Sequence, residues 1–403
     1  MVSRRVIAPP QLRVPDGNRG RHATYLEIFY DLVFVVAVGA ASNVFADDLS
    51  WRGAVRAFAL FVPVWWAWVG HTVYDTRFDT DDVIQRLWTF GMMLAAAGMA
   101  VAIPHAFERS ARGFALAYVG ARVCLLALYL RARHYVPETR PITSLYLLGF
   151  SIGAACWAVS LIVPAPARYV LWAVGLAVDF VTPWLGIRWL QRVPVDNAHL
   201  PDRFGSFTLI VLGEVILVIV THVSGDHLNV PAIGCAVCAF GITVAAWWQY
   251  FTFLEIAPFI ENLSSGQPYI YLHLPVLAGL TTLGIGLGEA VAEAGQPYLR
   301  PATCAVLAAG FALWLSGAMG LKRVSIKKPF PLFVWTRYCS AIALLMLGAG
   351  LGLRFSALVT LATLWAVLLV HVILETRYWV RWEGTHASQR ASATTASNAL
   401  TPR

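Results

Sequence analysis

Two segments of this chain place carboxylates within apolar sequence. Glu214 lies near the centre of residues 207–220, a run with no Lys or Arg to pair with it. Asp31 lies in another apolar segment, one helical turn after Glu27. A charged side chain left alone at the centre of a membrane span costs about 2.5 kcal/mol or more. We therefore expect each embedded acid to pair with another helix, to be protonated, or to line a wet cavity.

Glu27 and Asp31 need different explanations. Thr24-x-x-Glu27 fits a capping box, and an acid in the first helical turn also suits the helix dipole. A structural role alone would therefore account for Glu27, and a site role remains open. Asp31 lies two turns into the segment, about 10 Å at a rise of 1.5 Å per residue, where capping does not explain it. Asp31 is expected to make an interhelical polar contact or to have a functional role.

Two further acids occur beside residues that alter their chemistry. His71 and Asp75 are four residues apart, so the carboxylate can orient or charge the imidazole. Asp179 precedes Pro183 by four residues, and the missing proline N–H frees the carbonyl of Asp179. A kinked helix with a buried acid would suit a binding site. The alternative is that Asp179 pairs with Arg203 or with another helix.

The candidate substrate- or proton-binding residues form one set of eight. They are Glu27, Asp31, His71, Asp75, Asp179, Arg203, Glu214 and His273. A lone histidine such as His273 is more often a packing residue than a ligand. The acids and His71 would form a metal or proton site if their helices converge, but no spacing matches a zinc or calcium signature. We therefore assign no catalytic residue, no cofactor and no metal.

Composition indicates the elements that must position these residues. Hydrophobic residues make up 58% of the 403 residues and charged residues only 13%, against about 25% charged in a soluble domain. Membrane crossings need about 20 apolar residues each. Such stretches occur at about 25–46, 55–74, 86–106, 113–131, 142–163, 168–190, 206–223, 231–254, 270–292, 302–321, 338–353 and 356–376. The sequence therefore predicts an all-α polytopic membrane protein with about twelve spans, and eleven is the alternative because only residues 353–355 separate the last two.

The basic residues predict the orientation of these spans. With both termini on one side, that side carries 22 of the 30 Lys and Arg residues, the opposite side carries seven, and Arg122 lies inside a span. This asymmetry favours cytoplasmic termini in a bacterial inner membrane. The net charge of +8 is then explained by topology and by attraction to anionic lipid. The expected partner is the lipid bilayer, and no nucleic-acid site is expected.

A polar segment near the middle of the chain suggests two halves. The predicted regions are a disordered N-terminal tail (1–20), a six-helix half (21–190), a cytoplasmic linker (191–203), a second six-helix half (204–383) and a disordered C-terminal tail (384–403). Trp65-Trp66 is echoed by Trp247-Trp248, 182 residues later. A shift of 182 or 183 residues brings Asp31 onto Glu214, or to within one residue of it. We interpret this as a parallel internal repeat, an arrangement that transporters use.

Three motifs resemble those of a known family. They are Arg21-x-Ala23-Thr24-x-Leu26-Glu27-x-Phe29-x-Asp31-Leu32-Val33-Phe34-Val35, then Arg203-Phe204-Gly205-x-Phe207-Thr208-x-Ile210-x-Leu212-Gly213-Glu214, and the shorter Tyr271-x-His273-x-Pro275. The first resembles the opening signature of the bacterial low temperature requirement A family, the second resembles that family's second signature, and the third a weaker one. The resemblance covers about residues 22–380. It implies a polytopic bacterial membrane protein and no settled reaction or substrate.

Three functions fit these observations. The favoured hypothesis is a secondary, proton-coupled transporter of a small molecule or ion not identified by the sequence, in which Glu214 and Asp31 bind the proton or a substrate cation. The first alternative is a structural or stress-related membrane protein in which the acids join helices. The second is an intramembrane enzyme acting on a lipid or isoprenoid. An enzyme is less favoured, and the absence of a Walker lysine loop argues against ATP-driven transport. The sequence indicates no oligomeric state.

Overall fold

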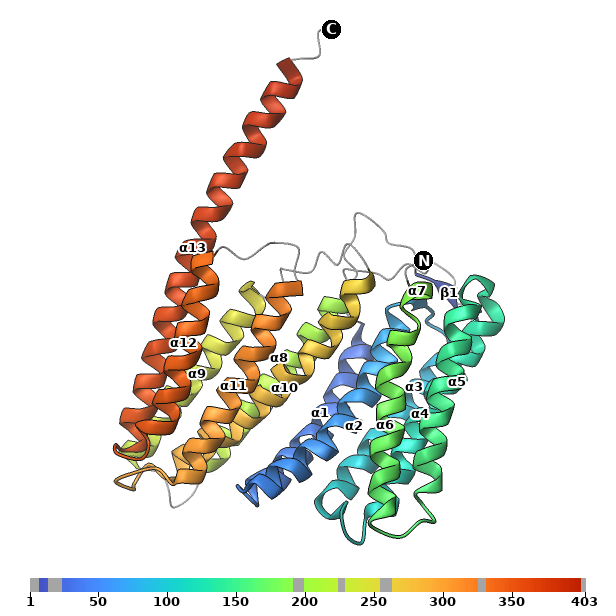
Figure 1. Cartoon of the computed structure of the whole chain (residues 1–403), viewed down its shortest axis with the longest axis horizontal. Coiled ribbons are helices and arrows are strands. Elements are labelled where there is room, and N and C mark those ends of the chain that lie inside the picture. Colours follow the sequence, from blue (N-terminus) through green and yellow to red (C-terminus); the bar gives the residue numbers. More distant parts are fainter. Residues whose placement is uncertain are drawn as a thin grey trace.

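The computed structural model describes residues 7–13, 24–190, 199–223, 229–253, 263–324 and 331–399. Figure 1 shows long helices lying side by side, with α1 (Tyr25–Ala46) and α2 (Trp51–Asp75) near the middle of the molecule. The end of the bundle at which α1 begins is called the N-terminal end below, and the other end the far end.

The first half of the chain forms six long helices. After α1 and α2 these are α3 (Val83–Ala102), α4 (Ala111–Tyr135), α5 (Arg140–Val159) and α6 (Ala167–Leu185), with the short α7 (Ile187–Leu190) and two single-turn 3-10 helices, η1 (Ile103–His105) and η2 (Pro137–Thr139). Helix α1 packs against α2, α3 and α8, and α4 packs between α3 and α5.

The described residues of the second half form six more helices. They are α8 (His199–Val223), α9 (Val230–Phe253), α10 (Leu263–Ala292), α11 (Pro301–Val324), α12 (Pro331–Gly350) and α13 (Ala357–Ala399). Helix α10 packs most extensively on α11 and α8, while α13 packs on α9 and α12. In Figure 1, α13 continues well beyond the other helices.

Among the described residues, eleven helices are long and apolar enough to cross a membrane. The remaining long helix, α12, has a shorter apolar stretch at Cys339–Gly348. A helix satisfies its backbone hydrogen bonds internally, which is what a chain in hydrocarbon requires. The prediction of an all-α polytopic membrane protein is confirmed, and α12 is the helix responsible for the choice between eleven and twelve spans.

Local sequence explains where the central helices begin. Thr24 and Glu27 form the predicted capping box of α1: the Thr24 hydroxyl accepts from Glu27 N, and the Glu27 carboxylate accepts from Thr24 N. The Ser50 hydroxyl accepts from the first backbone N–H groups of α2. The Asp82 carboxylate accepts from Gln85 N at the start of α3. Each cap satisfies N–H groups that a helix leaves unpaired in its first turn.

The two halves meet where α1 lies against α8. Glu27 contacts His199 and Asp31 contacts Arg203, a constant separation of 172 residues. A constant separation means that the two helices run in the same direction. We call this contact the α1–α8 seam. Helices α1 and α8 therefore enter the bundle from the same end.

Three predicted boundaries differ from the structure. Residues 7–13 belong to the tail predicted to be disordered, yet they form an ordered N-terminal strap. Its strand β1 (Gln11–Leu12) pairs antiparallel with β2 (Phe78–Asp79), which follows α2. Helix α8 starts at His199 and so includes the end of the predicted linker. Helix α13 continues through the predicted C-terminal tail to Ala399.

The predicted internal repeat stays a prediction. Trp65 and Trp66 are buried, with 0% and 3% of their surface exposed, whereas Trp247 and Trp248 are 41% and 40% exposed. The two tryptophan pairs therefore have different environments. Burial also explains Trp65 and Trp66 better than the anchoring at a membrane interface that tryptophan often provides.

Candidate functional site

The centre of the α1–α8 seam is a buried ion pair. Asp31 and Arg203 are both 0% exposed. The Arg203 guanidinium donates from Nη1 to Asp31 Oδ2 (3.0 Å) and from Nη2 to Asp31 Oδ1 (2.8 Å). The Trp68 indole of α2 donates to the same Oδ1 (2.7 Å). Two parallel charge-assisted hydrogen bonds contribute stability and also fix the relative orientation of the two side chains. The pair therefore holds α1 and α8 in one register at the N-terminal end.

A second charged contact lies one helical turn nearer the N-terminal end. Glu27 Oε1 lies 3.2 Å from His199 Nε2, and both residues are buried. Glu27 thus caps its own helix and also contacts the other half of the molecule. The prediction that Glu27 caps α1 is confirmed. The same side chain also makes the contact with His199 across the two halves.

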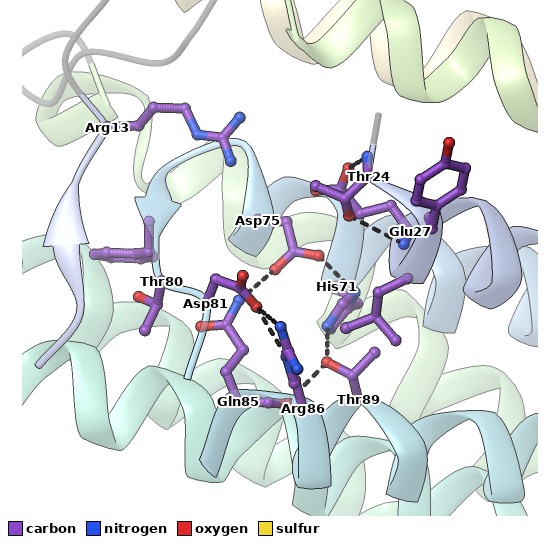
Figure 2. A pocket seen from close by; sticks show the side chains of 13 residues that line it. Arg13, Thr24, Glu27, His71, Asp75, Thr80, Asp81, Gln85, Arg86 and Thr89 are labelled. Carbon is purple, nitrogen blue, oxygen red and sulfur yellow. Dashed lines mark hydrogen bonds and ion pairs between the residues drawn. The ribbon is translucent and has the colours of Figure 1, made fainter. Parts of the chain in front are cut away.

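Beside the seam is a polar pocket of about 220 Å³ at the N-terminal end. Its walls come from α1, α2, α3 and the N-terminal strap, and Figure 2 shows polar side chains from these elements converging on it. Glu27, His71, Asp75, Gln85 and Thr89 are among the lining residues. The pocket adjoins the seam because Glu27 belongs to both.

The hydrogen bonds of His71 locate a proton in this pocket. The Thr89 hydroxyl donates to the Gln85 carbonyl oxygen (2.9 Å), so its oxygen accepts from His71 Nε2 (3.1 Å). If both hydrogen bonds are made, Nε2 carries the hydrogen of the imidazole. His71 Nδ1 lies 3.1 Å from Asp75 Oδ2, off the direction of a well-aligned hydrogen bond.

The contact between His71 and Asp75 requires one more proton. If Nδ1 were bare and Asp75 ionised, a lone pair would face a carboxylate at 3.1 Å in a buried site. A proton on His71 Nδ1 or on the Asp75 carboxyl group would remove this repulsion. Gln85 Nε2 donates to Asp75 Oδ1 (3.0 Å), and the ring of Tyr30 stacks on His71 with centroids 4.4 Å apart. The predicted i, i+4 pairing is present, and it can hold or release one proton.

The N-terminal strap covers one side of the pocket and is fixed by charge. Arg131 of α4 donates to both carboxylate oxygens of Asp82 (3.0 and 2.6 Å) and to the Ala8 carbonyl oxygen (2.5 Å). Asp82 also accepts from Ala8 N (3.2 Å). Burial alone would raise the pKa of Asp82, but the hydrogen bonds from Arg131 and from backbone N–H groups outweigh it and lower the pKa below its usual 3.8. Arg13 of the strap lines the pocket (Figure 2).

Asp179 lies in a separate buried cluster within the first half. Arg122 of α4 is 3.0 Å from Asp179 Oδ2, and the Tyr118 hydroxyl donates to the same oxygen (2.9 Å). Arg122 in turn donates to the Tyr118 hydroxyl (2.9 and 2.5 Å). All three are at most 1% exposed. The alternative that Asp179 pairs with another helix therefore holds, and its partner is Arg122.

Glu214 has fewer polar contacts than the other embedded acids in the described part of the chain. Its side chain is partly exposed on α8, and no hydrogen bond or ion pair of Glu214 is recorded within the described ranges. Its carboxylate lies against α1 so closely that a methyl group added at Gly39 would come within 2.7 Å of Oε1. Gly39 is eight residues beyond Asp31, about 12 Å at 1.5 Å per residue. Glu214 therefore lies deeper along the seam than Asp31, and the two acids have different environments.

His273 is a packing histidine. Nδ1 donates to the Tyr269 carbonyl oxygen (2.8 Å), which leaves Nε2 to accept from the Tyr250 hydroxyl (2.9 Å). The ring is also close to Phe204, with centroids 4.5 Å apart. This arrangement satisfies a neutral imidazole completely, as expected for a buried residue on a helix–helix interface.

The structure gathers five of the eight candidates at the N-terminal end of the seam and separates three. Glu27, Asp31, His71, Asp75 and Arg203 lie at the seam or in the pocket next to it. Asp179, Glu214 and His273 lie elsewhere. Within the described part of the chain, no three His, Cys, Asp or Glu residues lie close enough together to hold a metal ion.

Sequence reasoning missed several residues of these clusters, among them Arg122, His199, Gln85 and Thr89. Arg122 had a clear signal, because an arginine inside an apolar span is expected to have a buried acidic partner. Gln85 and Thr89 are four residues apart on one face of α3, but only the fold brings that face to His71.

Comparison with known proteins gives two matches. Residues 22–373 match the family described as bacterial low temperature requirement A protein (LtrA). A protein of Rhizobium meliloti (strain 1021), described as uncharacterised, is 31% identical over 320 residues, which cover 75% of this chain and 78% of that protein. The family match, residues 22–373, spans the positions of all eight candidate residues.

Proposed function

Because the chain belongs to the bacterial low temperature requirement A family, and because His71 and Asp75 lie 3.1 Å apart in its polar pocket, we propose that this multi-pass membrane protein is a proton-coupled secondary transporter of a small polar solute. The proposal places it in the cytoplasmic membrane with both termini in the cytoplasm, supported by the 22 basic residues on that side against seven on the other.

The contact between His71 Nδ1 and Asp75 Oδ2, 3.1 Å apart in the polar pocket, is the observation that carries this proposal. A coupled transporter needs a group that changes protonation where the solute binds, and histidine is the side chain suited to do so near neutral pH. The pair lines the pocket, so a solute there contacts the protonation site directly. Protonation changes the charge of the pocket wall by one unit and thereby changes its affinity for a charged solute.

The α1–α8 seam supplies the means of coupling. Asp31–Arg203 and Glu27–His199 join the halves beside the pocket. Trp68 donates to Asp31 and lies one helical turn before His71 on α2, which links the protonation site to the cross-half ion pair. In transporters built from two similarly oriented halves, access alternates as one half rocks against the other. We propose that the two cross-half pairs close the cytoplasmic side and break when the halves rock.

The size of the pocket limits the solute. Its volume of about 220 Å³ is below the roughly 300–1,000 Å³ typical of pockets for drug-sized ligands. The solute is therefore a small polar molecule or ion. Glu214, deeper along the seam, is proposed as a second proton-carrying group.

The test is proton flux in proteoliposomes that enclose a pH-sensitive dye. A panel of small cations, amino acids and polar metabolites is added to vesicles with and without a pH gradient. Solute-dependent proton movement in the wild type, lost in Asp75→Asn, is the expected result. Asp81→Asn is the matched control, because Asp81 lines the same pocket but pairs with Arg86 at the surface (2.7 Å).

Two outcomes would contradict the proposal. One is a panel in which no solute moves protons with the wild-type protein. The other is a flux whose size and pH dependence are the same in Asp75→Asn as in the wild type. If only Glu214→Gln leaves flux and pH dependence unchanged, the role of Glu214 is wrong and the pocket assignment stands.

A purely structural role is the second candidate, and the Asp179–Arg122 pair favours it. That pair is completely buried within one half and lies apart from the polar pocket, so it shows that this chain also uses embedded acids to join helices. If all the acids serve this purpose, Asp75→Asn changes stability without any flux to lose.

A further inference from the structure

An apolar cavity of about 480 Å³ lies between the two halves, toward the far end of the bundle. We propose that this interhalf cavity binds one acyl chain of a membrane phospholipid, whose phosphate lies beside Arg52. The cavity is lined by α1 and α2 of the first half and by α10 and α11 of the second. This site is separate from the polar pocket, and the inference does not rest on the proposed transport function.

Small side chains from all four helices create the space. Ala41, Ala54, Ala278 and Ala309 line the cavity, and alanine leaves room where larger side chains would close the contact. The Ser42 hydroxyl, which also lines the cavity, already donates to the Val38 carbonyl oxygen (3.2 Å). The other polar groups of the described lining are the hydroxyls of Thr281 and Thr282. A mostly apolar cavity of this volume lies within the usual range for ligand pockets.

The position of the cavity rim identifies the occupant. Val55 and Phe58 of α2 line the cavity and remain 57% and 48% exposed. Both belong to a helix long and apolar enough to span the membrane. The medium at an exposed apolar rim within a span is lipid hydrocarbon, so an acyl chain can enter from the side without crossing water.

The start of α2 supplies a site for the headgroup. Trp51 is 73% exposed and lies on the same helical stripe as Val55 and Phe58, at i, i+4 and i+7. Exposed tryptophan is typical of the membrane–water interface. The exposed Arg52 guanidinium lies 5.8 Å from the Trp51 ring centre, and guanidinium groups bind phosphate through paired hydrogen bonds. A chain entering past Val55 therefore leaves its phosphate near Arg52.

The experiment measures retained phospholipid on the full-length protein. The protein is purified in mild detergent, exchanged into detergent without lipid, and analysed by native mass spectrometry before and after addition of phosphatidylglycerol. The wild type is expected to keep one phospholipid per chain. Ala309→Phe fills the cavity and is expected to lose this lipid. Ala97→Phe, a change of the same size at an exposed position of α3, is the matched control and is expected to keep it.

Arg52→Gln separates the headgroup from the acyl chain. Loss of a charge-assisted hydrogen bond is expected to weaken binding of phosphatidylglycerol about tenfold, while the retained chain length stays the same. Size-exclusion chromatography checks folding of each variant, and Ala54→Leu replaces Ala309→Phe if the latter does not fold.

Three results would overturn the inference. The first is a wild-type protein that retains no phospholipid and gains none on addition. The second is equal retention by Ala309→Phe and the wild type. The third is a wild-type dimer that Ala309→Phe converts to a monomer with no change in lipid, since the cavity would then be covered by a second copy of the chain.

Discussion

Removal of one partner of the Asp31–Arg203 pair should destabilise the folded protein strongly. Both side chains are 0% exposed, and Asp31 accepts three hydrogen bonds of 2.7–3.0 Å. Arg203→Met leaves a carboxylate that keeps only the Trp68 indole as a donor. Breaking a buried ion pair in this way costs about 3–5 kcal/mol, which is a roughly 10²- to 10⁴-fold change in the unfolding equilibrium.

Two further variants divide this cost. Trp68→Phe removes one hydrogen bond to a charged acceptor and should cost about 1.5–3 kcal/mol. The double change Asp31→Leu with Arg203→Met removes both charges, so it should cost several kcal/mol less than the sum of the two single changes. A double-mutant cycle measured by denaturant unfolding in detergent gives the coupling energy directly.

The control is the exposed pair Arg86–Asp81, whose side chains are 41% and 39% exposed. Arg86→Gln should change the free energy of unfolding by about 0–1 kcal/mol. If Arg203→Met costs no more than Arg86→Gln in protein that still folds, the argument that the halves are joined by a dehydrated ion pair is refuted.

Two other predictions concern the seam and the strap. Gly39→Leu should destabilise the protein or displace α1, because the new side chain meets the Glu214 carboxylate, whereas Gly213→Leu should be tolerated, since a Cβ there has nothing within 4 Å; thermal unfolding of the two variants compares them, and equal losses would contradict the placement of Glu214. The pKa of Asp82 is lower in the folded protein than in the unfolded chain, where it is about 3.9. Ionised Asp82 therefore stabilises the strap fully above the unfolded pKa. This stabilisation is lost as the pH falls through the pKa of the folded protein. Asp82→Asn should therefore release the strap at neutral pH, as acid is expected to do in the wild type, and Arg131→Gln should do the same. Faster tryptic cleavage after Arg13 measures the release, and unchanged cleavage would show that Asp82 does not hold the strap.

The positions of the helices were predictable because the constraint is local. A stretch of about 20 apolar residues in a membrane has to form a helix, and the capping box of Thr24 and Glu27 could be read from four consecutive residues. The sequence also identified the acids that needed partners. Asp31 and Asp179 both proved to be buried in ion pairs with arginine.

The partners themselves could not be assigned, because they depend on which helices pack together. Arg203 lies 172 residues from Asp31, and nothing local to either residue indicates that α1 and α8 are neighbours. The expected match of Asp31 with Glu214 was drawn from sequence spacing alone. Packing places Asp31 against Arg203 and leaves Glu214 beside Gly39, so residues at similar positions in the two halves have different surroundings.

The seam also constrains how the protein is made. Asp31 enters the membrane with the first helix, but Arg203 is synthesised 172 residues later. At about 5–20 residues per second, the growing chain carries this acid without its arginine for roughly 9–34 s. During that interval the first half must retain α1 close to the insertion machinery or keep Asp31 protonated. The arrival of α8 then supplies the guanidinium, so the buried ion pair can form only after about half of the 403 residues have been synthesised.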